Sequence, residues 1–305
     1  MSTSAHVTQV SPKTEDETLE QETSGRTEVE RIRRILEERG MDPCSAYWDE
    51  LGYVATNLSW QELVEGQLDG IHFRGALSLI GTRGIRDLSG VNGTRLFSID
   101  ISESDITRLP NLRGGIIADV VAINSDLESL DGLQGSEIEI LDIGGTRVYD
   151  LAPLADCRVS ELGMTDTSIG DLTPLRNMTN LYYVAAARTK ITDLSPLAGA
   201  RLRFLDVSQT QVTSIEDLNV SWLEEVSVWK TLVTNINCLA GSPVHKLSID
   251  VEEVANAIPV MTQMTNLCWV NSIKIRDVRA KMPASPEIRA VLTTADALTG
   301  PVTSN

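Results

Sequence analysis

The chain has few aromatic and few basic residues. Aromatic side chains make up 4% of its 305 residues, so a packed core must be built mainly from Leu, Ile and Val. The 26 basic residues are outnumbered by 43 acidic ones, which gives a formal net charge of −17 at pH 7. Such a chain would repel the phosphate backbone of nucleic acid and an anionic membrane surface. We therefore expect neither as a partner: the acids either keep an elongated molecule in solution or attract a basic protein.

Long apolar runs are absent as well. The N-terminal segment MSTSAHVTQVSPKTEDETLEQ has no basic stretch followed by an apolar one, and nowhere do 18 apolar residues follow one another. The chain has four cysteines, of which Cys157 and Cys238 are expected to be small buried hydrophobes rather than a disulfide. These absences predict a cytoplasmic protein, and we expect a monomer.

Signatures of catalysis and of metal binding are missing too. The three histidines, His6, His72 and His245, are scattered, and His245 lies in the strand of a late repeat with no Cys or carboxylate at ligand spacing. There is no P-loop, no GxGxxG after a strand and no nucleophile elbow. The sequence therefore predicts a protein that is not an enzyme and that uses no cofactor and no metal.

What the sequence has in abundance is a repeat of 21 residues. The same pattern of apolar residues starts at Leu181, again at Leu202 and again at Leu223. A fixed period of this length with LxxLxL at its head is typical of leucine-rich repeats, in which each unit adds one short strand and a return segment to a solenoid. The pattern predicts an α/β solenoid, a curved array of about nine to ten units with a parallel sheet on its concave face. The remaining units are expected to start near Leu77, Leu96, Ile117, Ile138, Val159, Val244 and Leu267.

The repeats suggest a division of the chain into four parts. Residues 1–26 are acidic and polar and are expected to be disordered. Residues 27–73 form a helical cap, residues 74–278 form the repeat domain, and residues 279–305 are either a loose tail or a capping helix that starts at Ser285.

Within the cap, the first helix is expected at residues 28–39. Thr27 and Glu30 form a capping box, and Gly40 and Pro43 end the helix. A second helix is expected to begin at Ser45 and to carry three apolar side chains, Trp48, Leu51 and Val54. Ser59 and Glu62 repeat the capping-box spacing before Leu63 and Val64.

One unit is ambiguous. In the unit from Ile117, either Val120 and Ala122 or Val121 and Ile123 could face the core. A shift of one residue along a strand exchanges its two faces, so both alternatives stand.

Two further patterns are expected to be structural. A hydroxyl follows the strand in most units, as at Thr146, Thr167 and Thr189, where it can bond backbone groups of the turn and of the neighbouring unit. The sequence Asp-Leu-x-Pro-Leu follows at 150–154, 171–175 and 193–197, where Pro favours a turn and the two leucines point into the core.

The combination LxxLxLxxTxIxDLSPL, complete at Leu181–Leu197, resembles the repeats of bacterial internalin-like leucine-rich proteins. The resemblance covers about residues 77–275. It implies a curved solenoid, a parallel sheet on the concave face, short 3₁₀ or extended segments on the convex face, and protein recognition as the usual role. Later units depart from the pattern, because 215–218 and 236–239 lack Asp-Leu-x-Pro-Leu.

We expect the partner to bind on the concave face, where strand side chains alternate outward. The outward positions of the earlier units are acidic and include Ser98, Asp100, Asp119, Asp142 and Glu161. Those of the later units are Tyr183, Phe204, Asp206, Glu225, Trp229, Lys246 and Trp269. An aromatic patch rimmed by charge is typical of a protein-binding hot spot. The sequence thus favours a non-enzymatic scaffold, an adaptor or an inhibitor of a basic protein; the alternative is an exported effector or surface protein of the internalin-like type.

Overall fold

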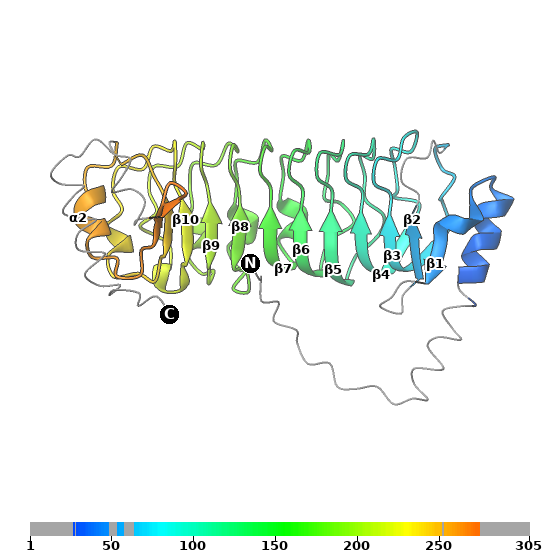
Figure 1. The fold of residues 1–305 in the computed structure, drawn as a ribbon. Helices are drawn as coiled ribbons and strands as arrows, with labels where there is room; N and C mark the ends of the chain where they lie inside the picture. Colours follow the sequence, from blue (N-terminus) through cyan, green and yellow to red (C-terminus); the bar gives the residue numbers. More distant parts are fainter. Residues whose placement is uncertain (1–26, 28, 49–53, 58–63, 252, 275–305) are drawn as a thin grey trace, which may run out of the picture.

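The computed structural model describes residues 27, 29–48, 54–57, 64–251 and 253–274 (Figure 1). The expected disordered segment 1–26, the capping-box spacing at Ser59 and Glu62, and the expected helix after Ser285 lie outside these residues.

The described chain is a leucine-rich repeat solenoid of about nine turns, as expected. Its 13 strands form one sheet in sequence order and stand side by side along the molecule (Figure 1). The strands are β1 (Ala46–Trp48), β2 (Val54–Asn57), β3 (His72–Ser78), β4 (Asn92–Asp100), β5 (Ile116–Val121), β6 (Glu137–Asp142), β7 (Arg158–Gly163), β8 (Tyr183–Ala185), β9 (Phe204–Asp206), β10 (Glu225–Ser227), β11 (Lys246–Ser248), β12 (Trp269–Val270) and β13 (Ile273–Lys274). The ladder from β2 to β12 is parallel, and in the regular coils each residue pairs with the one 21 or 22 positions later, as Glu161 does with Tyr183 and Tyr183 with Phe204.

A single continuous core fills the coils. Leu181, Val184 and their equivalents in the other units are buried, and Leu205 in β9 has no exposed surface. The structure decides between the two alternatives for the unit from Ile117. Val120 and Ala122 are fully buried, whereas Ile123 is 38% exposed. This unit therefore keeps the register of its neighbours and presents Val121 and Ile123 outward.

The expected row of hydroxyls is present where each chain segment leaves its strand. Thr146 donates to the carbonyl oxygen of Ile143 at 2.7 Å, and Thr189 donates to that of Ala186 at 2.8 Å. The same bond to the residue three positions earlier recurs at Ser104, Ser125, Thr167, Thr210 and Thr231. Each of these hydroxyls serves its own turn rather than the neighbouring coil, which satisfies a carbonyl group at the end of the strand.

The Asp-Leu-x-Pro-Leu segments form short 3₁₀ turns on the return side of the coil. These are η2 (Ala152–Leu154), η3 (Thr173–Leu175) and η4 (Ser195–Leu197). In each, an Asp carboxylate accepts a hydrogen bond from the backbone N–H two residues later, as Asp171 does from Thr173 at 2.8 Å. The Thr173 side chain and this backbone bond together lower the pKa of Asp171. These residues are structural, as expected, and the later 3₁₀ turns η5 (Val220–Trp222) and η6 (Asn237–Leu239) form without the motif.

The first helix of the cap is also present. Residues 29–38 are helical and bury Val29, Ile32 and Leu36 against the N-terminal end of the core. The helix ends at Gly40, which has a φ of +74°. Met41 N–H reaches back to the carbonyl oxygen of Leu36 at 2.8 Å, the bond that is typical of a glycine-terminated helix.

The prediction of a second helix that begins at Ser45 is wrong. Ser45 ends a 3₁₀ turn, η1 (Pro43–Ser45), in which its hydroxyl donates to the carbonyl oxygen of Asp42 at 2.5 Å. The chain then enters β1, which pairs antiparallel with β2, and β2 pairs parallel with β3. The open edge of the parallel sheet offers hydrogen bonds that a helix could not supply, so strand pairing overrides the local helical pattern. The parallel ladder thus begins at β2, before the first repeat seen in the sequence at Leu77, and β3 spans the expected boundary between residues 73 and 74.

The C-terminal end of the described chain is closed in a similar way. Leu267 is buried and starts the expected final repeat, whose strand β12 pairs with the antiparallel strand β13. A five-residue helix that the sequence pattern did not predict, α2 (Ala257–Met261), packs Ala257 and Val260 on the core. Among the described residues, no helix has the length and apolar character needed to cross a membrane.

Candidate functional site

The exposed side of the parallel sheet, here called the sheet face, carries three columns of outward residues. Strand pairing sets the first column, which runs Ser98, Asp119, Ile140, Glu161, Tyr183, Phe204, Glu225, Lys246 and Trp269. The second column runs Asp100, Val121, Asp142, Gly163, Ala185, Asp206, Ser227 and Ser248. A third column lies in the turns just past the strands and includes Ile123, Gly144 and Trp229.

Two of the expected aromatic residues form a stacked pair. Tyr183 of β8 and Phe204 of β9 are paired in register, and their ring centroids lie 4.2 Å apart with 7° between the ring planes. Both side chains are half-buried. The pair forms one contiguous aromatic surface in the middle of the first column, as the sequence analysis expected for neighbouring strands.

The two expected tryptophans are placed differently. Trp229 lies in the turn after β10, not in a strand, because β10 ends at Ser227. It is 36% exposed, and the Lys230 Nζ atom lies 4.2 Å from the centre of its ring. Trp269 does lie in the first column, in β12, three strands beyond Phe204. The structure thus brings Tyr183 and Phe204 into contact and places the tryptophans toward the edge and the end of the sheet face.

Four carboxylates on the earlier part of the sheet face have no basic neighbour in the described part of the chain: Asp100, Asp119, Asp142 and Glu161. Several other acids are paired with bases one coil away, although some, such as Asp150 and Asp171, are not. Arg158 pairs with Glu137 at 3.0 Å, Arg203 with Glu224 at 2.8 Å, and Lys246 with Glu225 at 2.7 Å. Of the expected site residues, Glu225 and Lys246 therefore neutralise each other, whereas the four acids leave the sheet face negative.

The negative potential shows in the pKa values of nearby groups. Burial raises the pKa of Asp119, and the carboxylates of Asp100 and Glu161 raise it further. The pKa of Tyr182 rises to about 12, because its hydroxyl is partly buried and donates to Glu161. A carboxylate in such surroundings would be stabilised in its charged form by a bound cation.

Two of the expected site residues also have a structural role. Asp142 accepts a hydrogen bond from the Gly144 N–H at 3.0 Å, and Asp206 accepts one from the Ser208 N–H at 2.9 Å. Each bond closes the turn after its strand and uses only Oδ1 of the carboxylate. The Asp142 carboxylate leans over Gly163, where a Cβ atom would lie 2.7 Å from its Cγ, so the glycine leaves room for it.

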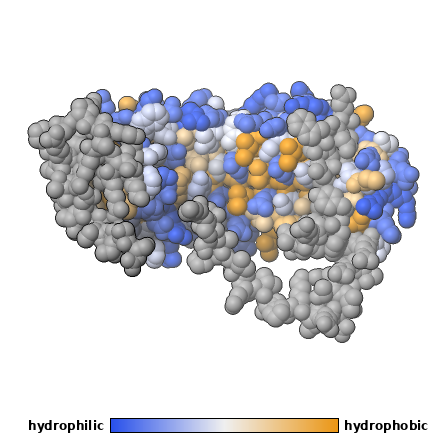
Figure 2. All heavy atoms as spheres, in the orientation of Figure 1, coloured by the Kyte–Doolittle hydropathy of each residue, from blue (hydrophilic) through white to orange (hydrophobic). Residues whose placement is uncertain are grey.

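Sequence reasoning missed an apolar patch on the same face, which we call the isoleucine patch: Val121, Ile123 and Ile140. Val121 of β5 and Ile140 of β6 are half-buried, and Ile123, in the turn after β5, is 38% exposed. Figure 2 shows apolar residues gathered over these strands with hydrophilic residues around them. The ambiguous register of the unit from Ile117 hid Val121 and Ile123, while Ile140 was overlooked beside the inward Leu141.

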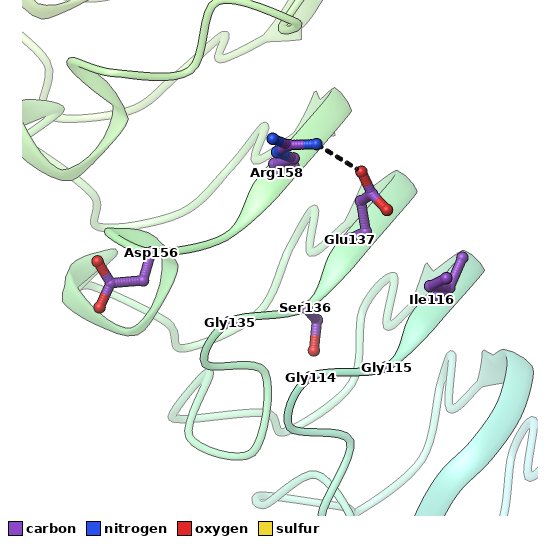
Figure 3. Close-up of a pocket in the computed structure, with 8 residues that line it drawn as sticks. All are labelled: Gly114, Gly115, Ile116, Gly135, Ser136, Glu137, Asp156 and Arg158. Carbon is purple, nitrogen blue, oxygen red and sulfur yellow. Dashed lines mark hydrogen bonds and ion pairs between the residues drawn. The ribbon is translucent and has the colours of Figure 1, made fainter.

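A hollow lies near the start of β5, β6 and β7 (Figure 3). Its floor is formed by the turns at Gly114, Gly135 and Ser136, and the ion pair between Arg158 and Glu137 lies at its rim. The hollow is open and mostly polar, and two of its three charged groups, Arg158 and Glu137, pair with each other. Within the described ranges, no cluster of His, Cys, Asp or Glu side chains could hold a metal ion.

The unneutralised acids lead to a prediction about stability. Asp119→Asn should raise the free energy of unfolding at pH 7, by up to about 0.5 kcal/mol, because it removes one of three mutually repelling charges. A carboxyl whose pKa is higher in the folded chain than in the unfolded chain costs stability when it is ionised and costs none below its ordinary value of 3.8. The gain should therefore shrink as the pH falls from 7 toward 4, as measured by urea unfolding.

A matched control for this variant is Asp126→Asn. Asp126 pairs with Arg147 at 2.8 Å, so its neutralisation should lower stability or leave it unchanged at pH 7. A loss of stability in Asp119→Asn at pH 7 would show that its charge is already compensated.

Comparison with known proteins gives similarities at the level of the fold only. No protein-family model matches the chain and no curated protein matches its sequence. An internalin (inlF) from Listeria monocytogenes is similar at 14% identity and a TM-score of 0.44, over 71% of this chain and 86% of that one. Internalin C2 (inlC2) from the same organism is similar at 20% identity and a TM-score of 0.46, over 64% and 80%.

The functional domain of InlJ from Listeria monocytogenes is 16% identical, with a TM-score of 0.46 and 72% of this chain covered. The match covers 53% of that structure, so the chain spans about half its length. Similarity at this level says nothing about what the chain binds. The leucine-rich repeat fold follows from the chain's own coils, ladder and buried leucines.

Proposed function

We propose that this protein is a non-enzymatic interaction scaffold that holds a basic protein partner on its sheet face. The observation that carries the proposal is a cluster of carboxylates without ion pairs on the adjacent strands β4 to β7. Asp100, Asp119, Asp142 and Glu161 form no ion pair in the described chain, and the charges of Asp100 and Glu161 help to raise the pKa of Asp119. A free protein gains nothing from this repulsion, but a cationic partner would relieve it.

The stacked ring pair is a second observation in favour of the sheet face as the binding site. Tyr183 and Phe204 lie on the strands that follow Glu161, so a stacked aromatic pair borders the acidic surface. Aromatic side chains surrounded by charge are typical of the residues that contribute most to protein binding. The acids would then attract and orient the partner, and the rings would hold it.

The finer role that we propose is that of an adaptor or an inhibitor. A sheet face built from many strands can cover a broad surface, and an acidic one would mask a basic surface on the partner. We propose that this happens in the cytoplasm with the scaffold as a monomer. Fractionation of the native cells tests the location. The molar mass of the purified chain in solution tests the oligomeric state.

The proposal is tested by neutralising the acids without changing their shape. The triple variant Asp119→Asn, Asp142→Asn and Glu161→Gln keeps an oxygen that can accept the Gly144 N–H. Its matched control is Asp150→Asn, Asp171→Asn and Asp193→Asn, which removes the same charge from the 3₁₀ turns and also keeps their hydrogen-bond acceptors.

Full-length wild type and both variants are used to capture partners from the native cells, and the bound proteins are quantified by mass spectrometry. We expect a basic protein that is bound by the wild type and the control and is lost from the sheet-face variant. Its association rate with the sheet-face variant should also be slower and less dependent on salt. If the two variants capture the same proteins in the same amounts, the sheet face is not the binding site.

A further inference from the structure

The sheet face carries two separate apolar surfaces with acids between them. The isoleucine patch lies over β5 and β6, and the Tyr183–Phe204 pair lies over β8 and β9. Their centres are three strand positions apart, or about 14 Å at ~4.8 Å per strand. Between them, β7 contributes Glu161 to the first column, and β6 contributes Asp142 to the second.

We propose that the sheet face binds one extended segment of its basic partner, which places an aliphatic side chain on the isoleucine patch, a basic side chain at Glu161 and Asp142, and an apolar ring on the Tyr183–Phe204 pair. This inference rests on the proposed function and adds the shape and the residue pattern of what is bound.

The spacing selects an extended segment. In an extended chain, residues four apart are on the same side and about 13 Å from each other, which matches the separation of the two apolar surfaces. In an α-helix, the same-face residues nearest to this separation are seven apart, at about 10.5 Å, or eleven apart, at about 16.5 Å. A helix therefore misses the separation by about 2.5 Å at best, whereas an extended chain misses it by about 1 Å.

The charges select the residue between the two anchors. In an extended chain, the residue two positions after the first anchor points to the same side and lies midway, about 7 Å along. At that place the sheet face presents the Glu161 carboxylate and the Asp142 carboxylate. Asp142 uses its Oδ1 for the Gly144 N–H, and no described hydrogen bond uses its Oδ2. A Lys or Arg at this position would find two acids that have no basic neighbour in the described chain.

The second column leaves space for the segment. Beside Tyr183 it holds the small residue Ala185, whereas the space over Gly163, beside Glu161, is taken by the Asp142 carboxylate. The backbone of a bound segment can approach the sheet at Ala185, while the larger residues of the first column line one side of it. The expected pattern is thus an aliphatic residue, any residue, Lys or Arg, any residue, and an aromatic residue.

The test uses synthetic nine-residue peptides and the full-length protein. The matched peptide has Leu at its third position, Arg at its fifth, Phe at its seventh, and Gly or Ser elsewhere. One control peptide has the same composition with Leu and Phe adjacent, and a second has Glu in place of Arg. Affinities are measured by calorimetry or by NMR titration at low salt.

We expect the matched peptide to bind about tenfold more tightly than the shuffled one, and the Glu peptide not to bind measurably. Ile140→Thr and Phe204→Ala should each remove the preference for the matched peptide. Ile116→Thr is the control: Ile116 is 78% exposed at the start of β5, outside the isoleucine patch, so the preference should remain. Threonine suits a strand, so both isoleucine variants should keep the fold.

Equal affinity for the matched and shuffled peptides would overturn the inference, as would an Ile116→Thr effect as large as that of Ile140→Thr. Such a result would leave the proposed function intact as long as the captured partner still depends on the acids of the sheet face. If capture is also independent of those acids, the proposed function itself fails.

Discussion

Replacing Leu205 by Asp should unfold several coils together. Leu205 has no exposed surface and lies in β9, between the coils of β8 and β10. The substitution removes a buried apolar side chain and places an unpaired carboxylate in the core, so we expect a loss of more than about 4 kcal/mol in the free energy of unfolding. Because each coil buries its leucines only against its neighbours, the damage should spread along the solenoid.

Circular dichroism and hydrogen exchange measure this effect. We expect a large fall in the melting temperature and faster exchange of backbone amides in the coils on both sides of β9. Gln211→Asp is the control, since Gln211 is exposed in the same coil and the variant adds the same charge. A melting temperature of Leu205→Asp within error of the wild type would mean that the coils do not share a stacked core.

The second large effect is expected on binding. Phe204→Ala should weaken the affinity for the captured partner by about 2 kcal/mol, or roughly thirtyfold in Kd. The variant removes half of the stacked pair and leaves the Tyr183 ring without its neighbour at 4.2 Å. Since Phe204 points away from the core, the fold should persist, with a loss of stability of about 1 kcal/mol from the ring contact.

The control for this variant is Trp222→Ala. Trp222 is 54% exposed in η5, on the return side of the coil, so its removal should leave the affinity unchanged. Affinity is measured by calorimetry with the purified partner, and stability by thermal unfolding of each variant. Full affinity in Phe204→Ala together with a loss in Trp222→Ala would move the binding site to the return side.

The repeated coils could be predicted from the sequence because the same pattern of apolar residues recurs in each coil. Leu181, Leu202 and Leu223 fix the period, and burial then fixes which residues of each strand face inward. The ends could not be predicted in this way. Ser45 begins a good local helix pattern, yet the edge of the sheet draws residues 46–48 into β1, a preference that depends on a partner strand and not on the local sequence.

The sheet face was predicted only where its residues differ in kind from the core. Tyr183, Phe204 and Glu161 stand out as residues that a core of leucine does not use. Ile140 and Val121 do not stand out, because an outward isoleucine and an inward one look the same in a sequence. Trp229 was predicted in a strand but lies in the turn after it, since the pattern does not show that β10 ends at Ser227.

The antiparallel strands at the two ends of the sheet have a consequence for how such a molecule changes in length. β1 and β13 are the end strands of the described ladder. The regular coils between them all pair through the same kind of parallel hydrogen bonds. Adding or removing one whole coil therefore leaves both ends intact and moves everything beyond it by one strand, about 4.8 Å. The distance between two surfaces on the sheet face can therefore change only in steps of one strand spacing. A partner with a different spacing between its anchors could be matched by the gain or loss of 21 residues rather than by new side chains.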